Sequence, residues 1–439
     1  VFQLESGGMI NLCKQFGVSD LEDISALLAL YRPGPMDLIP DYIARKKGEK
    51  EIRYEHPLLE QVSANTYGIM IYQEQVQKAA NLLAGYSLGQ ADLLRRAMGK
   101  KDKSKMAIER EKFVAGCAEA NKIAAKKANK IFDTLEKFAG YGFNKSHSCA
   151  YGLITYQTAY LKANYPVEFM AGVLSNEINN TEKISVFVNE CKNMDIDILP
   201  PDINRSQIKF APERIDDVSQ NGRNGTNMAI RYGLAAIKGV GQGAMEMVLQ
   251  ERAAEGDYTG LENFATRVDS KSVNKKAMES LIKAGAFDFT GEERPALYSR
   301  IAQVVASSQA ATKDRASGQG SLFDTLDITA AAPQEQVVEE TWTKDEILTY
   351  EKDLLGFYVT GHPLDSYRNT ILSKAKARSY LDLEELEVGK DRRNQITHEF
   401  IAFVSSAQIK YTKAKGLPFA ILITEDLHAS AEVLVWNDV

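Results

Sequence analysis

The chain of 439 residues contains little cysteine and no long apolar run. The four cysteines, Cys13, Cys117, Cys149 and Cys191, stand far apart and form no C-x-x-C pair, which argues against a zinc site and a disulfide framework. No stretch approaches the ~18 apolar residues of a membrane helix, and no signal peptide is evident. The motif G-x-x-x-x-G-K-[ST] is missing, which argues against a P-loop hydrolase. We therefore expect a cytoplasmic protein without a membrane partner.

The chain also lacks an excess of positive charge, since its formal net charge is −6. Overall charge does not exclude nucleic acid, because only the local field over the phosphates matters for binding. Hydrophobic residues make up 44% of the chain, which is enough for packed cores. A length of 439 residues predicts about three domains.

The run from Gly140 to Pro166, GYGFNKSHSCAYGLITYQTAYLKANYP, combines a glycine-rich loop with polar residues at the start of a helix. Lys145, Ser146 and His147 can reach a phosphate, and the free N–H groups of the helix point the same way. The pattern predicts a triphosphate site. The plainer alternative is a capped helix with a polar loop.

A second basic run, LLRRAMGKKDKSK, covers residues 93–105 and supplies Arg95, Arg96, Lys100 and Lys101. Helical spacing predicts a buried face made of Leu93, Leu94, Ala97 and Met98, a helix end at Gly99, and a cap for the next helix at Asp102. Arg95 and Arg96 point about 100° apart on a helix, so we expect only one to face a given cleft. The two basic runs are candidates for opposite walls of one cleft, and the alternative is a solvated basic face.

The stretch LAAIKGVGQGAMEMVLQ, residues 234–250, fits a helix-hairpin-helix. Ile237 and Val240 would anchor the hairpin, while Gly239 and Gly241 would let the backbone approach a DNA phosphate at the start of the next helix, expected from Ala244. The candidate DNA-binding residues are Ile237, Lys238, Gly239, Val240, Gly241 and Gly243. The alternative is a glycine-containing turn.

Several long strings carry a family resemblance, in the family's order. They are YRPGPMDLIPDYIARKKG, YGIMIYQEQV, RRAMGKK, FAGYGFNKSHSCAYGLITYQTAYLKANYP, ILPPDIN, IKGVGQG, KAGAFD and YVTGHPLDSY. Together they resemble the finger region and the segments that follow it in bacterial replicative DNA polymerase III alpha subunits. The resemblance extends over nearly the whole chain.

The resemblance implies a DNA-directed DNA polymerase, a nucleotidyltransferase, of which this chain is a fragment. Its partners would be template-primer DNA, the incoming dNTP, the sliding clamp and other replicase subunits. The dNTP phosphates would contact Arg95, Arg96, Lys100, Lys101, Lys145, Ser146 and His147. Mg²⁺ would be held by palm aspartates that precede Val1, so we expect the chain alone to bind no metal and to be inactive. The alternative is a non-catalytic DNA-binding and clamp-tethering scaffold whose parent lacks those aspartates.

The polar stretch 304–341 contains Gln319, Ser321, Leu322 and Phe323, and this QGSLF string resembles the family's internal clamp-binding peptide. Gln319 would fix the register while Leu322 and Phe323 fill an apolar pocket. The alternative is that these two apolar side chains dock on their own domain.

We expect a mostly α-helical multi-domain fold: helical fingers, a helix-hairpin-helix domain, and a partial C-terminal β OB-fold. The expected parts are 1–199 (palm end and fingers), 200–303 (a hairpin over 206–233 and the helix-hairpin-helix domain), 304–395 (a linker with the clamp peptide and a short helix over 342–357) and 396–439 (partial OB-fold). Strands are expected at 400–404, 418–424 and 431–436. Lys410, Tyr411, Lys413 and Lys415 would contact single-stranded DNA there.

Overall fold

The computed structural model describes residues 1–100, 103–215, 227–269, 272–316, 341–373, 377–380, 383, 396–412, 416–427 and 429–436. The chain forms two compact units, unit 1 (Val1–Tyr165) and unit 2 (Pro166–Val439). Their boundary lies before the expected one at 199, because the helices over 166–193 bury their apolar faces in unit 2. Among the described residues, no helix has the length and apolar character needed to cross a membrane.

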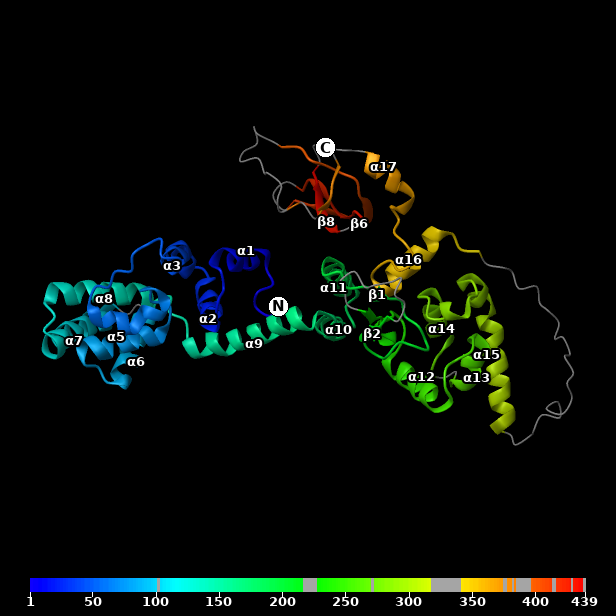
Figure 1. Cartoon of the computed structure of the whole chain (residues 1–439), viewed down its shortest axis with the longest axis horizontal. Coiled ribbons are helices and arrows are strands. Elements are labelled where there is room, and N and C mark those ends of the chain that lie inside the picture. The colour runs from blue at the N-terminus through cyan, green and yellow to red at the C-terminus, as the bar shows by residue number, and fades with distance from the viewer. Residues whose placement is uncertain are drawn as a thin grey trace, which may run out of the picture. The chain divides into compact units, whose positions relative to one another are not determined.

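Unit 1 is built from helices (Figure 1). They are α1 (Gly7–Phe16), α2 (Leu21–Leu30), α3 (Ile39–Lys46), α4 (Glu60–Ser63), α5 (Gln73–Ala84), α6 (Leu88–Lys100), α7 (Lys103–Asn121), α8 (Ala125–Ala139) and α9 (Lys145–Asn164). Short 3-10 turns cover Pro35–Leu38, Pro57–Leu59 and Ala64–Thr66. Side chains cap several helices; Asp20, for example, accepts a hydrogen bond from the Asp23 N–H at the start of α2.

Two apolar clusters hold unit 1 together. One joins α5, α6, α7 and α8 around Leu83, Phe113 and Phe132, and the other joins α1, α2 and α3 around Leu27 and Tyr42. On α8 the apolar side chains of Ala128, Ile131, Phe132 and Leu135 recur at helical spacing and are fully buried.

Helix α6 corrects two expectations. Leu94, Ala97 and Met98 are buried, but Leu93 is 64% exposed because it lies at the edge of their face, about 100° around the helix from Leu94 and about 140° from Met98. The helix also continues past Gly99 to Lys100. A glycine costs a helix only about 1 kcal/mol, which the packed face of α6 overcomes. Asp102, the expected cap of the next helix, lies outside the described residues.

Unit 2 begins with α10 (Pro166–Asn176), α11 (Thr181–Asn193) and a small sheet. Its strands are β1 (Ile198–Leu199), β2 (Ala211–Arg214) and β3 (Met228–Arg231), in the order β1-β3-β2. The antiparallel pairing of β2 with β3 confirms the expected hairpin, whose turn lies outside the described residues. Strand β1 pairs in parallel with β3, which the sequence pattern did not predict because β1 has only two residues.

Further helices of unit 2 follow this sheet. They are α12 (Gln242–Glu255), α13 (Leu261–Arg267), α14 (Lys275–Lys283), α15 (Arg294–Ala316) and α16 (Lys344–Leu355). The expectation that a linker starts at 304 was wrong, because α15 continues to Ala316. Val304 is buried in the core, and the Ser308 hydroxyl donates a hydrogen bond to the Ala265 carbonyl.

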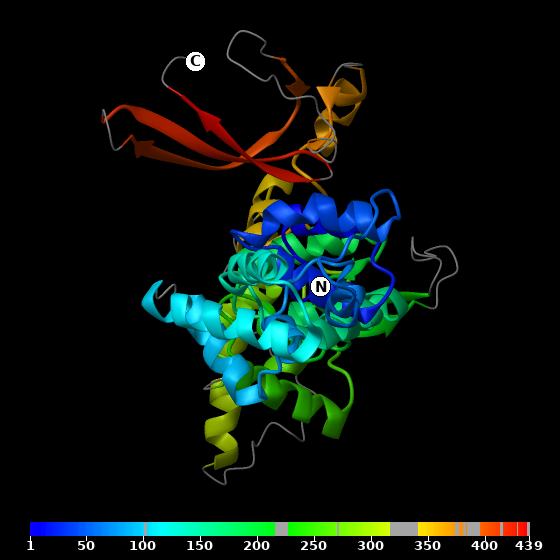
Figure 2. The same cartoon turned by 90° about the vertical axis from the view of Figure 1, so that its left-hand side faces the viewer.

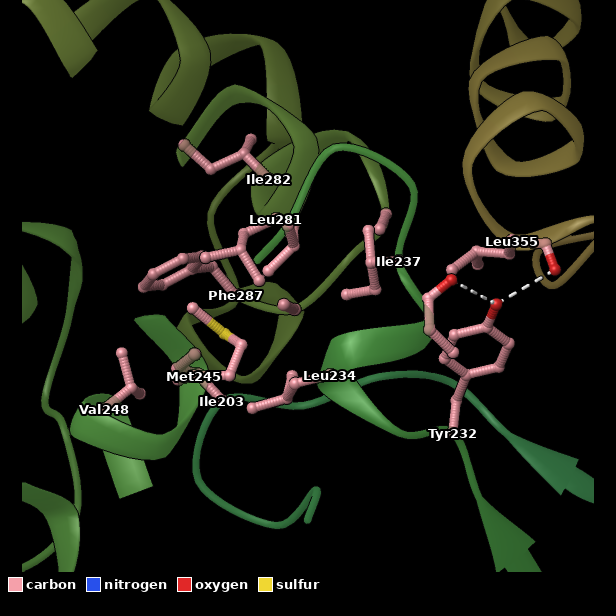
Figure 3. Close-up of a cluster of buried hydrophobic side chains, with 14 of the residues drawn as sticks. Ile203, Tyr232, Leu234, Ile237, Met245, Val248, Leu281, Ile282, Phe287 and Leu355 are labelled. Carbon is pink, nitrogen blue, oxygen red and sulfur yellow. Dashed lines mark hydrogen bonds between the residues drawn. The ribbon is translucent and has the colours of Figure 1, made fainter. Parts of the chain in front are cut away.

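The main core of unit 2 draws on residues from both sides of the undescribed segment 317–340 (Figure 3). Ile237, Leu281 and Phe287 are buried in it together with Leu355, which lies beyond that segment. The Tyr232 hydroxyl donates to the Leu355 carbonyl at 3.0 Å. Helix α16 therefore belongs to the same core as the helices around α12.

The C-terminal part of unit 2 contains α17 (Arg368–Ser373), a short parallel pair and an antiparallel sheet. The pair is β4 (Ala377–Arg378) with β5 (Glu399–Phe400), and the sheet has β6 (Phe403–Tyr411), β7 (Pro418–Glu425) and β8 (Ser430–Val435) in sequence order. Figure 2 shows the three antiparallel strands in orange and red. The strands expected at 418–424 and 431–436 are present as β7 and β8, whereas the strand expected at 400–404 is interrupted after Phe400, and β6 begins at Phe403 and runs on to Tyr411. Whether they form part of an OB-fold stays a prediction.

Candidate functional site

The loop before α9 lies against the start of α5 in unit 1. The Phe143 N–H donates to the Ile71 carbonyl at 2.9 Å, and the Gln73 N–H donates to the Phe143 carbonyl at 2.9 Å. A Cβ atom on Gly142 would come within 3.2 Å of Gln73. This close approach favours glycine at position 142, because a larger residue would push Gln73 aside.

The side chain of Gln73 connects this loop to the basic helix α6. Its amide nitrogen donates to the Gly142 carbonyl at 3.1 Å, and its amide oxygen accepts from Arg95 Nη1 at 3.2 Å. The Arg95 side chain is 23% exposed, whereas that of Arg96 is 65% exposed. Of the two arginines, Arg95 is therefore the one directed toward α5 and the loop.

Carboxylates neutralise these cations. Asp92 pairs with Arg95 at 2.9 Å and with Arg96 at 2.7 Å. Hydrogen bonding from Arg95, together with the charges of both arginines, lowers the pKa of Asp92. Glu22 on α2 pairs with the Lys145 ammonium at 3.1 Å. A phosphate that binds here would meet cations that already have partners.

Protein oxygens also accept hydrogen bonds from the first turn of α9. The Asn144 side chain accepts from the His147 N–H at 2.8 Å, and the Glu74 carboxylate accepts from the Lys145 N–H at 3.0 and 3.1 Å. These two N–H groups were expected to point at a phosphate. A phosphate would have to compete with Glu74 and Asn144 for them.

His147 points away from Lys145, about 200° around the helix. Its ring lies 4.4 Å from that of Tyr151 and 5.5 Å from that of Phe143. It lines a pocket of about 290 Å³ together with Arg32. The two basic residues at the start of α9 thus face different neighbours.

Arg32 is a functional candidate that the motif analysis missed. Its guanidinium lies 4.3 Å from the centre of the Phe143 ring and donates to the Tyr141 carbonyl at 3.0 Å. Burial lowers the pKa of Arg32. The sequence could have indicated Arg32, because it belongs to YRPGPMDLIPDYIARKKG, one of the strings that carry the family resemblance.

The remaining phosphate candidates lie at the edges of this site. Ser146 is exposed. Lys100 is the last residue of α6, but its side chain lies outside the described part of the chain, and so does Lys101. The described cluster therefore consists of Arg95, Arg96 and Lys145 with their bound carboxylates.

The glycine-containing hairpin of unit 2 precedes α12. Ile237 and Val240 are buried, so they anchor the hairpin as expected. Gly239 has φ +87°, and a Cβ there would come within 3.1 Å of the Ser280 hydroxyl, so a larger residue would strain the fold. A Cβ on Gly241 would meet no atom within 4 Å.

Helix α12 starts at Gln242, two residues before the expected start, with Gly241 as its N-cap. Gly243, in its first turn, is exposed and also has open space around an added Cβ. The Lys238 N–H is already used, since it donates to the Leu354 carbonyl at 3.0 Å. The N–H groups at the start of α12 are therefore the better candidates for contact with a phosphate.

The string KAGAFD, one of those that carry the family resemblance, is part of the core. Ala284, Ala286 and Phe287 are buried. Gly285 has φ +86°, and a Cβ there would come within 2.4 Å of the Arg294 guanidinium. Packing accounts for this string without any contact to DNA.

The other candidates are placed only in part. Lys410 and Tyr411 lie in β6, and Tyr411 is 68% exposed. Lys413 and Lys415 lie outside the described residues. So does the string with Gln319, Ser321, Leu322 and Phe323, the candidates for clamp binding.

Comparison with known proteins matches two regions of the chain to families. Residues 1–121 match the bacterial DNA polymerase III alpha subunit finger domain, and residues 195–297 match a helix-hairpin-helix motif. The second match covers the hairpin before α12 and the string KAGAFD.

Curated relatives named DNA polymerase III subunit alpha align with most of the chain. The protein of Xylella fastidiosa (strain 9a5c) is 46% identical over 84% of this chain and 30% of its own length. Those of Neisseria meningitidis serogroup A and Borreliella burgdorferi are 42% and 41% identical, over 99% and 100% of this chain and 36% of their own lengths. The chain thus spans about a third of the relatives it matches. It belongs to the family of bacterial DNA polymerase III alpha subunits.

Proposed function

We propose that this chain, within a complete alpha subunit, binds the incoming nucleotide and the template-primer duplex during DNA-directed DNA synthesis. The observation that carries the nucleotide part is the link through Gln73, which joins Arg95 to the loop that leads into Lys145. Phosphoryl transfer depends mainly on positioning and on electrostatic stabilisation of the phosphates, and a cation held as Arg95 is by Gln73 and Asp92 can supply both.

Arg95 and Lys145 are the proposed phosphate contacts, and Arg96 adds to the local positive field. The carboxylates of the described cluster, Asp92 and Glu22, are paired with its cations, whereas Mg²⁺ needs carboxylate oxygens and water that are open to it. We therefore assign the Mg²⁺ ions of the reaction to other groups of the complete enzyme. His147 faces the pocket that contains Arg32 and is assigned no contact with the triphosphate.

The hairpin before α12 is the proposed grip on duplex DNA. Its glycines leave the start of a helix open to a phosphate oxygen, which gives contact without sequence preference. Binding should weaken with salt, with a log–log slope near −0.9 per phosphate neutralised.

Replacing Gly241 by valine should weaken duplex binding by about tenfold or more, because a side chain would block a hydrogen bond to a charged phosphate. The loss should be the same for duplexes of different sequence. Gly239 is unsuitable for this test because its positive φ makes any replacement strained.

The measurement is a fluorescence-anisotropy titration of labelled duplexes at several salt concentrations. Gly172→Val is the matched control, since Gly172 is exposed in α10 of the same unit and an added Cβ there also meets open space. Equal affinities for the Gly241 and Gly172 variants would show that Gly241 only makes a turn.

The QGSLF string is the proposed contact with the sliding clamp. Burying a Leu or Phe side chain fully is worth about 1.5–3 kcal/mol each, so changing Leu322 and Phe323 to alanine should weaken clamp binding by at least about tenfold. Gln319→Ala should cost less, because it removes only a hydrogen bond. A clamp titration beside a melting curve measures both effects. Unchanged clamp affinity, or a large fall in melting temperature, would mean that the two side chains pack on their own domain.

A further inference from the structure

The cation of Lys145 already has an anionic partner, Glu22. The Lys145 ammonium lies 3.1 Å from the Glu22 carboxylate and 5.4 Å from the centre of the Tyr72 ring. The side chains of Glu22 and Lys145 are 49% and 34% exposed. The pair therefore lies in reach of solvent, and the ring of Tyr72 gives the ammonium a second contact that does not depend on Glu22.

Glu22 can leave this pair more easily than Asp92 can leave its own. Asp92 is only 31% exposed and holds two arginines, whereas Glu22 pairs with Lys145 alone among the described residues. A carboxylate and a phosphate oxygen repel each other when they share one ammonium. An incoming phosphate would thus displace Glu22, which is the more exposed of the two carboxylates and has fewer ionic partners.

We infer that Glu22 is a displaceable counter-ion, which occupies Lys145 in the absence of nucleotide and is exchanged for an oxygen of the triphosphate. The inference rests on the proposed binding of phosphates by this cluster. Because the ligand must replace the Glu22 carboxylate at Lys145, its affinity would depend on how much negative charge it carries. A triphosphate can compensate Lys145 and Arg95 together, whereas a single phosphate group cannot. Glu22 would therefore favour triphosphates over inorganic phosphate.

The test measures binding of Mg²⁺-free tripolyphosphate and of inorganic phosphate to the whole chain, by calorimetry at low salt. Glu22→Gln should tighten tripolyphosphate binding about two- to fivefold, the range expected when an exposed ion pair no longer competes. It should also reduce the preference for tripolyphosphate over inorganic phosphate. Helix α2 keeps its capping residue Asp20 in this variant.

Two controls separate displacement from a general change in charge. Glu51→Gln removes the same charge from an exposed pair with Arg53 elsewhere in unit 1 and should leave binding unchanged. In a Lys145→Met background, Glu22→Gln should no longer tighten binding, because the cation for which the two anions compete is gone. Equal tightening in both backgrounds would overturn the inference.

Different results would overturn the exchange of Glu22 and the phosphate site on which it rests. Binding of tripolyphosphate that Glu22→Gln leaves unchanged would overturn the exchange but keep the proposed phosphate site. No binding by the parent chain or any variant would overturn the proposed site, and the inference with it.

Discussion

Replacing Arg95 by methionine in a complete alpha subunit with this sequence is expected to slow single-turnover nucleotide incorporation by about 10²–10³-fold. Removal of one preorganised donor from a developing charge typically has an effect of this size. Arg95 is preorganised because Gln73 and Asp92 hold its guanidinium in place. Methionine keeps most of the aliphatic stem, so the variant tests the charge rather than the packing.

Arg96→Met is the matched control. Arg96 is the next residue on the same helix and pairs with the same Asp92, but its side chain is 65% exposed and has no contact with Gln73. Its loss should cost less than about tenfold, as expected for an exposed charge. Rapid-quench kinetics and duplex binding would be measured for both variants. Equal losses, or a normal rate for Arg95→Met, would place Arg95 on a solvated basic face.

Replacing Arg294 by methionine should destabilise unit 2 by about 3–5 kcal/mol, the typical cost of removing one partner of a buried ion pair. Arg294 Nη1 donates to Glu351 at 2.9 Å, and Arg294 Nη2 donates to Asp288 at 2.6 Å. Glu351 is fully buried, so the variant would leave its charge inside the core. A second change, Glu351→Gln, should restore part of the loss because it removes that charge.

Urea unfolding followed by tryptophan fluorescence measures this effect in unit 2 alone, because both tryptophans of the chain, Trp342 and Trp436, lie there. Arg300→Met is the control on the same helix. Arg300 pairs with Glu292 and Glu262, both well exposed, so its loss should cost at most about 1 kcal/mol. A loss for Arg294→Met no larger than for Arg300→Met would contradict a buried network.

Local patterns predicted much of the fold. Helical spacing identified three of the four residues predicted for the buried face of α6, and strand patterns identified β7 and β8. The predictions of secondary structure were wrong where contacts between residues far apart in the sequence determine the structure. The Ala- and Ser-rich start of the expected linker is helical because residues such as Val304 pack on the core.

For the candidate site, too, some features could be predicted from the sequence and others could not. The basic residues could be found from the sequence, and so could the expectation that only one of the two arginines faces a cleft. Their partners could not, because Glu22 lies on another helix far from Lys145 in the sequence. Gln73 joins two segments that are adjacent only in the folded chain. Pairings of this kind depend on tertiary structure and leave no periodic signal.

The core that Tyr232 shares with Leu355 has a consequence for how this family can vary. Residues on both sides of positions 317–340 belong to one core, so in sequence these positions fall within one folding unit rather than between two. The entropy of closing such a segment grows only with the logarithm of its length, and a doubling costs about 0.6 kcal/mol. Evolution can therefore lengthen, shorten or rewrite this segment, and the peptide it carries, at little cost to stability. A truncation that ends the chain before α16 would instead remove part of the core itself.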